Sequence, residues 1–141
     1  MNSTTIDLSP AVSSSRTLSS IERALPATGR VLIAAIFLLS GASKLADPTG
    51  SMAYISSAGL PLPPLALAGA ILVEIVGGLM LVAGYRLRAV ATVLALFSIA
   101  TAVFFHHALG DQNQFIHFFK NLAMAGGLLQ IVAFGKTGAR A

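Results

Sequence analysis

Cysteine is absent from the 141 residues of this chain, and so is tryptophan. The lack of cysteine excludes disulfides, a cysteine nucleophile, iron–sulfur clusters and zinc sites built on thiolates. Charge is also scarce, because Asp, Glu, Lys and Arg make up only 10% of the residues, against about 25% in soluble domains. So few charges could not cover a soluble globule of this size, and the sequence therefore predicts that the chain is solvated by a lipid bilayer.

The net charge of +4 does not indicate nucleic acid, because the cations lie at the ends of apolar runs, as topology signals do. Residues 1–26 are rich in Ser and Thr and predict a polar, disordered N-terminal tail. Residues 27–136 form one membrane domain, and residues 137–141 form a C-terminal tail.

Four apolar segments of about 19–24 residues are each long enough to span a bilayer. We expect these helices over residues 28–46, 65–84, 88–109 and 112–135. Asp47-Pro48 ends the first segment, because proline disfavours helix in the residue before it. Asp111, followed by Gln114, can cap the first turn of the last one. The predicted fold class is all-α, a four-helix transmembrane bundle.

Most basic residues fall on one side of the predicted spans, namely Arg16, Arg23, Arg30, Arg86, Arg88, Lys136 and Arg140. This distribution predicts that both termini are cytoplasmic and that the connection over residues 47–64 faces outward. Glycine-rich stretches recur at residues 77–84 and 126–135, which indicates two parallel-repeated helical hairpins. Close packing of membrane helices explains the same glycines without a repeat.

Ionisable side chains at membrane depth are the informative ones, because a charge near the midplane costs about 2.5–3.5 kcal/mol. Glu74 lies near the middle of the second span, and Lys120 lies well inside the fourth. We expect these two to pair, because pairing lowers the desolvation cost of both. Such a pair could be functional or a structural staple. Lys44, near the outer end of the first span, either snorkels to the interface or joins the site.

Several further polar residues extend this set. His117, Lys120, Asn121 and Met124 recur at three- and four-residue spacing and therefore share one helix face. Adjacent residues point about 100° apart, so one of His106 and His107 is expected to face the bundle. The candidate catalytic residues are Glu74, Lys120 and His106, and the candidate ligand-binding residues are Lys44, Asn121, His117 and His107. No metal site is predicted, because nothing in the sequence organises the three histidines as ligands.

Short motifs in a fixed order carry a family resemblance. They are Arg30 leading into the run from Ile36 to Leu45, Gly59-Leu60-Pro61, Glu74 to Leu79, Phe105-His106, and Phe119 to Ala123 before Gly126-Gly127. With these motifs, residues 29–135 resemble the DoxX family of small bacterial membrane proteins. The resemblance implies a four-helix inner-membrane protein, and some relatives are linked to thiosulfate oxidation with quinone as acceptor or to oxidative-stress systems. The positions matching the family pattern are Lys44, Glu74, His106, Lys120 and Asn121.

The leading hypothesis is a redox-linked membrane component that binds a quinone headgroup or a small oxidised-sulfur anion in the outer half of the bundle. Two lysines and a histidine against one glutamate predict a cationic pocket, in which Lys120 and Lys44 stabilise negative charge on oxygen and His106 transfers protons. No electron carrier is evident in the chain, so turnover would require a redox partner subunit or a second substrate. The alternatives are a non-catalytic membrane subunit that recruits or stabilises a partner protein, and a small exporter that would have to form a homo-oligomer.

Overall fold

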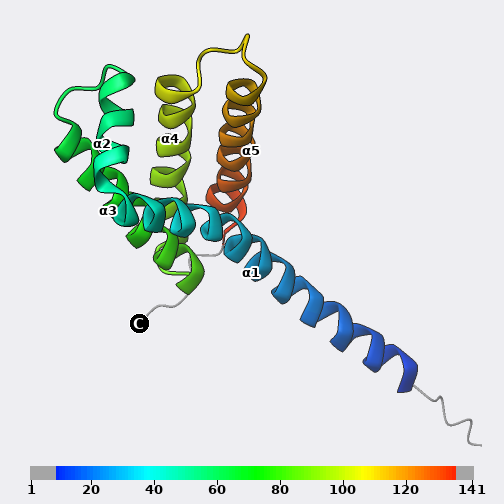
Figure 1. The fold of residues 1–141 in the computed structure, drawn as a ribbon. Helices are drawn as coiled ribbons and strands as arrows, with labels where there is room; N and C mark the ends of the chain where they lie inside the picture. Colours follow the sequence, from blue (N-terminus) through cyan, green and yellow to red (C-terminus); the bar gives the residue numbers. More distant parts are fainter. Residues whose placement is uncertain (1–8, 136–141) are drawn as a thin grey trace, which may run out of the picture.

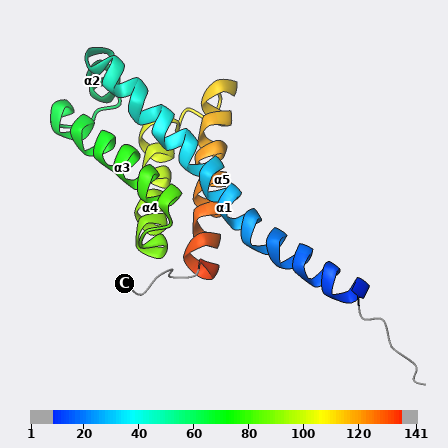
Figure 2. The ribbon, with the colours of Figure 1, turned by 90° about the horizontal axis from the view of Figure 1, so that it is seen from below.

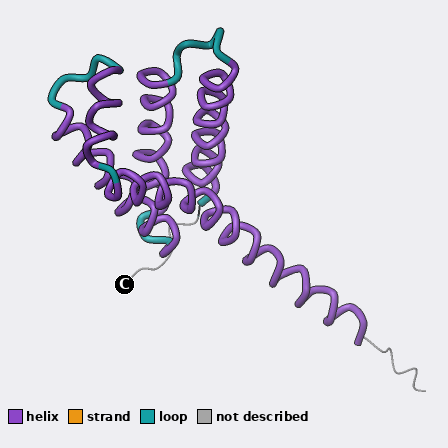
Figure 3. Tube along the Cα trace, viewed as in Figure 1, coloured by secondary structure: helices purple, strands orange, loops and turns teal. Residues whose placement is uncertain are grey.

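The computed structural model describes residues 9–135, with side chains from residue 24 onward. In this part of the chain, helices are joined by turns and short loops, and there are no strands (Figures 1 and 3). Its helices are α1 (Ser9–Ala46), α2 (Pro48–Ser57), α3 (Pro63–Ala83), α4 (Leu87–Phe105) and α5 (Gln112–Phe134). Four segments are long and apolar enough to cross a membrane: Ala24–Ala46, Pro63–Ala83, Leu87–Phe105 and Gln112–Phe134. The predicted all-α fold with four spans is confirmed.

Two helix boundaries differ from those expected. α1 begins at Ser9 and continues through Pro26, so it overlaps the segment expected to be a polar tail. Pro26 removes one backbone donor, and the helix continues past it. α4 ends at Phe105 instead of residue 109, and the chain then turns toward α5. Residues 1–8 and 136–141, which include the expected C-terminal tail, lie outside the described residues.

The short helix α2 interrupts the connection between the first two spans. Its start is encoded locally: the Asp47 carboxylate accepts a hydrogen bond from the backbone N–H of Gly50 at 2.9 Å, and Pro48 occupies the first turn, where proline is tolerated. Asp47-Pro48 was expected only to end the first span. The same dipeptide also begins the next helix.

Packing divides the spans into two pairs. α1 packs closely against α3, and α4 packs closely against α5, while contacts between α3 and α4 join the pairs. These pairs are the two hairpins predicted from the sequence. α1 crosses the bundle obliquely, and its N-terminal part extends past the other helices (Figures 1 and 2). α5 does not pack against α3. This arrangement limits which charged side chains can pair.

Glycine allows the α1–α3 contact to be close. A Cβ atom on Gly41 would lie 2.7 Å from Cδ1 of Ile75, and one on Gly78 would lie 2.8 Å from Cδ2 of Leu38. Small residues permit this approach of membrane helices. At the C-terminal end of α3, Gly84 takes a left-handed conformation with φ 74° and ends the helix, as is common at helix C-termini.

The apolar core occupies one half of the bundle. Its members are Ala34, Phe37, Leu81, Leu87, Val90, Ala91, Leu94, Ala95, Ala125 and Leu128. They come from the parts of the four spans nearest to the α3–α4 connection. The opposite half, beneath α2 and the α4–α5 connection, contains the polar residues singled out in the sequence, so the fold separates a packed half from a polar half.

The glycine contacts generate a stability prediction. Gly41→Val and Gly78→Val will each lower the free energy of unfolding in detergent by about 1–3 kcal/mol, because the added atoms overpack the α1–α3 contact. Gly69→Val is the matched control on α3, since a Cβ there would meet no atom within 4 Å. Equal melting temperatures for all three variants would contradict close α1–α3 packing.

The orientation stays a prediction from the distribution of basic residues. Alkaline phosphatase fused after Ile55 will be active, because this connection faces the periplasm. Fusions of a fluorescent protein after Leu87 and after Ala141 will fluoresce, because both positions face the cytoplasm. A periplasmic C-terminus would contradict the predicted topology.

Candidate functional site

A pocket of about 760 Å³ lies in the polar half of the bundle. Every helix contributes to its wall, which includes Phe37, Ser40 and Lys44 from α1, Tyr54 and Ile55 from α2, Glu74 from α3, Phe97 and Phe104 from α4, and His117, Lys120, Asn121 and Met124 from α5. His106, just beyond α4, also lines it. The lining is mainly apolar with a few polar groups, which is the usual composition of a small-molecule site.

One wall of the pocket holds a buried ion pair between α1 and α3. The Lys44 Nζ atom lies 2.9 Å from each carboxylate oxygen of Glu74 and donates a third hydrogen bond to the Ser40 hydroxyl at 2.8 Å. Ser40 in turn donates to Glu74 Oε1 at 3.0 Å. The Glu74 side chain is only 5% exposed. An ammonium group has three donors, so Lys44 has none left for a ligand.

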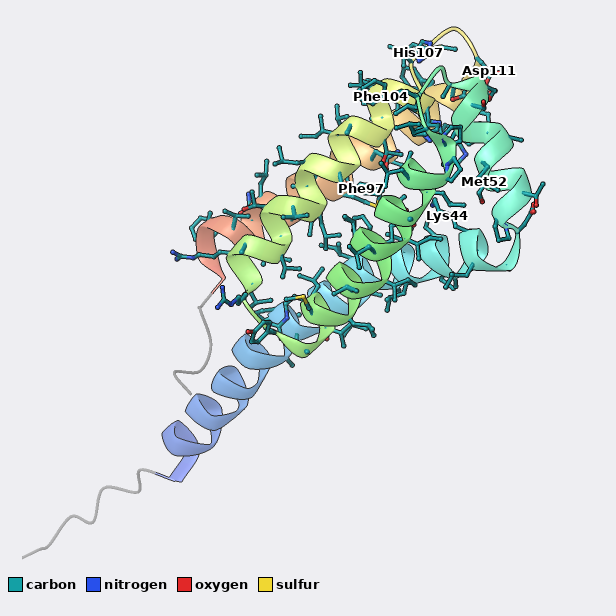
Figure 4. All side chains as sticks on the ribbon, turned by 90° about the vertical axis from the view of Figure 1, so that its left-hand side faces the viewer. Lys44, Met52, Phe97, Phe104, His107 and Asp111 are labelled. Atoms are coloured by element: carbon teal, nitrogen blue, oxygen red, sulfur yellow. The ribbon has the colours of Figure 1, made fainter. Side chains whose placement is uncertain are left out.

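This pairing corrects the sequence prediction that Glu74 pairs with Lys120. The prediction was wrong because α5 packs on α4 and does not reach α3, whereas Gly41 brings α1 directly against Glu74. The suggestion that Lys44 snorkels to the interface is also wrong, since its ammonium group turns inward to the carboxylate. Figure 4 shows Lys44 beside α2.

The opposite wall holds a group of polar side chains from the α4–α5 hairpin. The imidazoles of His106 and His117 stack with centroids 5.0 Å apart and an interplanar angle of 25°. Lys120 Nζ donates to Nδ1 of His117 at 2.9 Å, and Nδ1 of His106 lies 2.8 Å from Oε1 of Gln114. Asn121 is buried and donates to the backbone carbonyl of His117 at 3.0 Å. Lys120 has no carboxylate partner among the described side chains.

Two neighbouring histidines differ in position. His106 lines the pocket, whereas His107 is exposed and does not line it. Figure 4 shows His107 close to Asp111, in the connection between α4 and α5. Of the sequence candidates, the structure therefore brings together Lys44, Glu74, His106, His117, Lys120 and Asn121, and leaves His107 outside.

The charge balance of the pocket differs from the expected excess of positive charge. Asp47 also lines the pocket, so Lys44 and Lys120 stand against two carboxylates. Glu74 is engaged by Lys44, and Asp47 caps α2. Lys120 is thus the lysine whose remaining donors can meet a ligand, and the strong positive field expected for binding a free anion is missing from the described residues.

The sequence did not predict the roles of some residues in or next to the site. The ring of Tyr54 stacks on that of Phe105 with centroids 5.2 Å apart, and its hydroxyl donates to the Phe105 carbonyl at 3.4 Å. These contacts tie α2 over the pocket, and without α2 in the prediction Tyr54 could not be placed. Gln114 was noted only as part of a helix cap, and its contact with His106 was not expected.

The ion pair generates a prediction about stability. Lys44→Met will lower the free energy of unfolding by about 3–5 kcal/mol, because it leaves the Glu74 carboxylate buried and unpaired. Glu74→Leu will lower it less, because the Lys44 side chain is 24% exposed. The double variant will recover most of this loss, because apolar replacements for a buried pair are often neutral. Chemical unfolding in detergent measures all three.

Lys120→Met is the matched control, because Lys120 is exposed and takes no part in the ion pair. It will change the unfolding free energy little. If Lys120→Met proved as destabilising as Lys44→Met, the assignment of Lys44 as the partner of Glu74 would be refuted.

Comparison with known proteins gives a family and two relatives. The DoxX family model matches residues 25–107, which include Lys44, Glu74 and His106 and end before α5. Inner membrane protein YphA of Escherichia coli K12 is 31% identical over 111 residues, covering 75% of this chain and 79% of YphA. Inner membrane protein YqjF of the same strain is 32% identical over 106 residues, covering 75% of this chain and 80% of YqjF. No solved structure matches significantly.

The family match spans more than half of the chain, and both relatives align over most of their own length. Their names place them in the inner membrane, and this chain has four helices able to span it. The protein is thus a member of the DoxX family and a multi-pass inner-membrane protein.

Proposed function

We propose that this protein is a redox-linked membrane component that binds a quinone headgroup in the pocket between its two hairpins. The observation that carries the proposal is the arrangement of donors and protonatable groups on the α4–α5 wall, His106, His117 and Lys120, beside aromatic and aliphatic side chains. A quinone headgroup is a flat apolar ring with two carbonyl oxygens. Such a ligand requires an apolar slot with a few donors at its edge.

The pocket's size and charge favour a quinone over a small oxidised-sulfur anion. Its volume of about 760 Å³ lies in the usual range for small-molecule sites, about 300–1,000 Å³. A free anion would be small in this space and would face two carboxylates as well as two lysines. The described side chains thus support a neutral, mostly apolar ligand with polar oxygen atoms.

Access from the bilayer is also favourable. α1 and α5 pack together far less than either packs against the other helix of its hairpin, and one point where they approach is Ile33 over Gly127, in the packed half of the bundle. Both helices line the pocket in the polar half. A lipid-soluble molecule can therefore enter between the hairpins without crossing water.

Each residue of the pocket would have a separate role toward the ligand. Lys120 and the N–H of His117 donate hydrogen bonds to a ligand oxygen and stabilise negative charge on it. His106 gives or takes a proton at that oxygen, as imidazole can near neutral pH. Lys44 and Ser40 hold Glu74 and shape the facing wall. Quinone would supply acceptance of two electrons and two protons, and the electrons would come from a partner subunit or a second substrate.

A second candidate function is that of a non-catalytic membrane subunit that recruits or stabilises a partner protein. Two observations favour it. The ion pair of Lys44 and Glu74 is complete without any ligand, and the N-terminal part of α1 extends past the bundle, where another protein could contact it (Figure 2). In this case the protein would bind no quinone.

Extraction of bound quinone distinguishes the two. Protein purified in mild detergent will carry quinone, detected by organic extraction and mass spectrometry. Lys120→Met will weaken binding of added quinone about tenfold or more, because it removes a charged hydrogen-bond donor to the ligand oxygen. His107→Asn is the matched control, since its side chain lies outside the pocket. Equal quinone content in all variants would refute the site.

A further inference from the structure

Gln114 does not line the pocket, but it contacts His106, which does, and the proposed function leaves its role open. It is the third residue of α5, and in a capping box its side chain would turn back to the backbone N–H of the cap residue. Here the N–H of Asp111 already donates to the carbonyl of Ala108 at 3.0 Å. Asp111 still caps the helix by accepting from the N–H of Gln114 at 2.9 Å. The Gln114 side chain is thereby free to contact His106.

The contact of Gln114 defines which nitrogen of His106 carries the proton. Oε1 of an amide can only accept a hydrogen bond, and it lies 2.8 Å from Nδ1 of His106. Nδ1 must then carry the proton, and Nε2 of a neutral ring is left as a bare acceptor.

The contact of Lys120 has the opposite effect on His117. An ammonium group can only donate, and Nζ of Lys120 lies 2.9 Å from Nδ1 of His117. Nδ1 of His117 therefore accepts, and the proton of the neutral ring lies on Nε2. The two stacked rings, 5.0 Å apart, consequently differ in the atom left for a ligand: one offers an acceptor and the other a donor.

We infer that Gln114 is a positioning residue, which together with Lys120 holds His106 and His117 in opposite tautomers, so that the pocket presents a donor and an acceptor side by side. Both rings line the pocket. A carbonyl oxygen can use only the donor, whereas a hydroxyl oxygen can accept from His117 and donate to His106. The site is therefore matched to a hydroxyl-bearing ligand.

For the ligand, the inference rests on the proposed function and deepens it. A quinol carries the hydroxyl groups and a quinone the carbonyl groups, so the quinol makes one more hydrogen bond in the pocket. One net hydrogen bond corresponds to about three- to tenfold in affinity. The protein should bind the reduced form more tightly by that factor. The tautomers of the two histidines do not depend on any ligand.

Nitrogen NMR of the full-length protein in nanodiscs tests the tautomers directly. With ¹⁵N-labelled histidine at pH 8, protonated and bare ring nitrogens give separate signals, and the three histidines are assigned with His→Asn variants. We expect a proton on Nδ1 of His106 and on Nε2 of His117. In Gln114→Leu, His106 will lose its fixed Nδ1 proton, whereas Gln114→Glu, which retains an acceptor, will keep it. Gln130→Leu, farther along α5, is the matched control and will change neither ring.

The same tautomer on both rings, or a His106 signal that Gln114→Leu does not alter, would overturn the inference whether or not quinone binds. Binding is measured separately by anaerobic calorimetry with decyl-ubiquinone and its quinol. We expect the three- to tenfold preference for the quinol and its loss in Gln114→Leu. If the tautomers are as stated and neither compound binds, the proposed function fails and the assignment of Gln114 stands. Tighter binding of the oxidised form would overturn the ligand preference.

Discussion

The ion pair between Lys44 and Glu74 is the interaction on which the rest of the site depends. Glu74 lies eleven residues into α3, about 16 Å along the helix axis at 1.5 Å per residue, so it stands near the middle of the span, where an unpaired carboxylate is costly. Lys44 meets both carboxylate oxygens, and Ser40 completes the hydrogen bonds of the pair. This requirement fixes α1 against α3, and Gly41 supplies the room for it.

Because the ion pair is complete in itself, the chemistry available to a ligand lies on the other hairpin. All three donors of Lys44 are used within the α1–α3 wall, whereas Lys120 spends one donor on His117 and has two remaining. The pocket is lined by both hairpins, and α1 and α5 make little contact with each other. One hairpin thus provides a rigid polar wall, and the other provides the groups that can bind a ligand or exchange protons with it.

Much of this arrangement could be predicted from the sequence, because depth in a membrane helix follows from counting residues. Glu74, Lys120 and Asn121 were recognised as polar residues at depth, and the four spans, their hairpin pairing and the polar face of α5 were expected from spacing alone. The partner of Glu74 could not be predicted this way. Depth does not say which helices are neighbours, and that depends on where glycine lets two helices approach.

Gln114 illustrates a second limit of sequence reasoning. Its spacing from Asp111 correctly indicated a helix cap, and Asp111 does accept from its backbone N–H. The side chain is diverted because the chain between α4 and α5 turns tightly enough for Ala108 to occupy the N–H of Asp111. That turn follows from α4 ending at Phe105, four residues before the expected position. An error of one helical turn in a boundary was thus enough to hide a residue that contacts the site.

The two walls of the pocket share no hydrogen bond among the described side chains. Substitutions at positions without common partners usually have additive effects on stability. Changes in His106, His117 or Lys120 can therefore alter the ligand without loosening the ion pair of the other hairpin. The DoxX family model matches the whole α1–α3 wall and ends before α5, so the boundary of the match falls between the wall that holds the bundle and the helix that supplies most of the free donors.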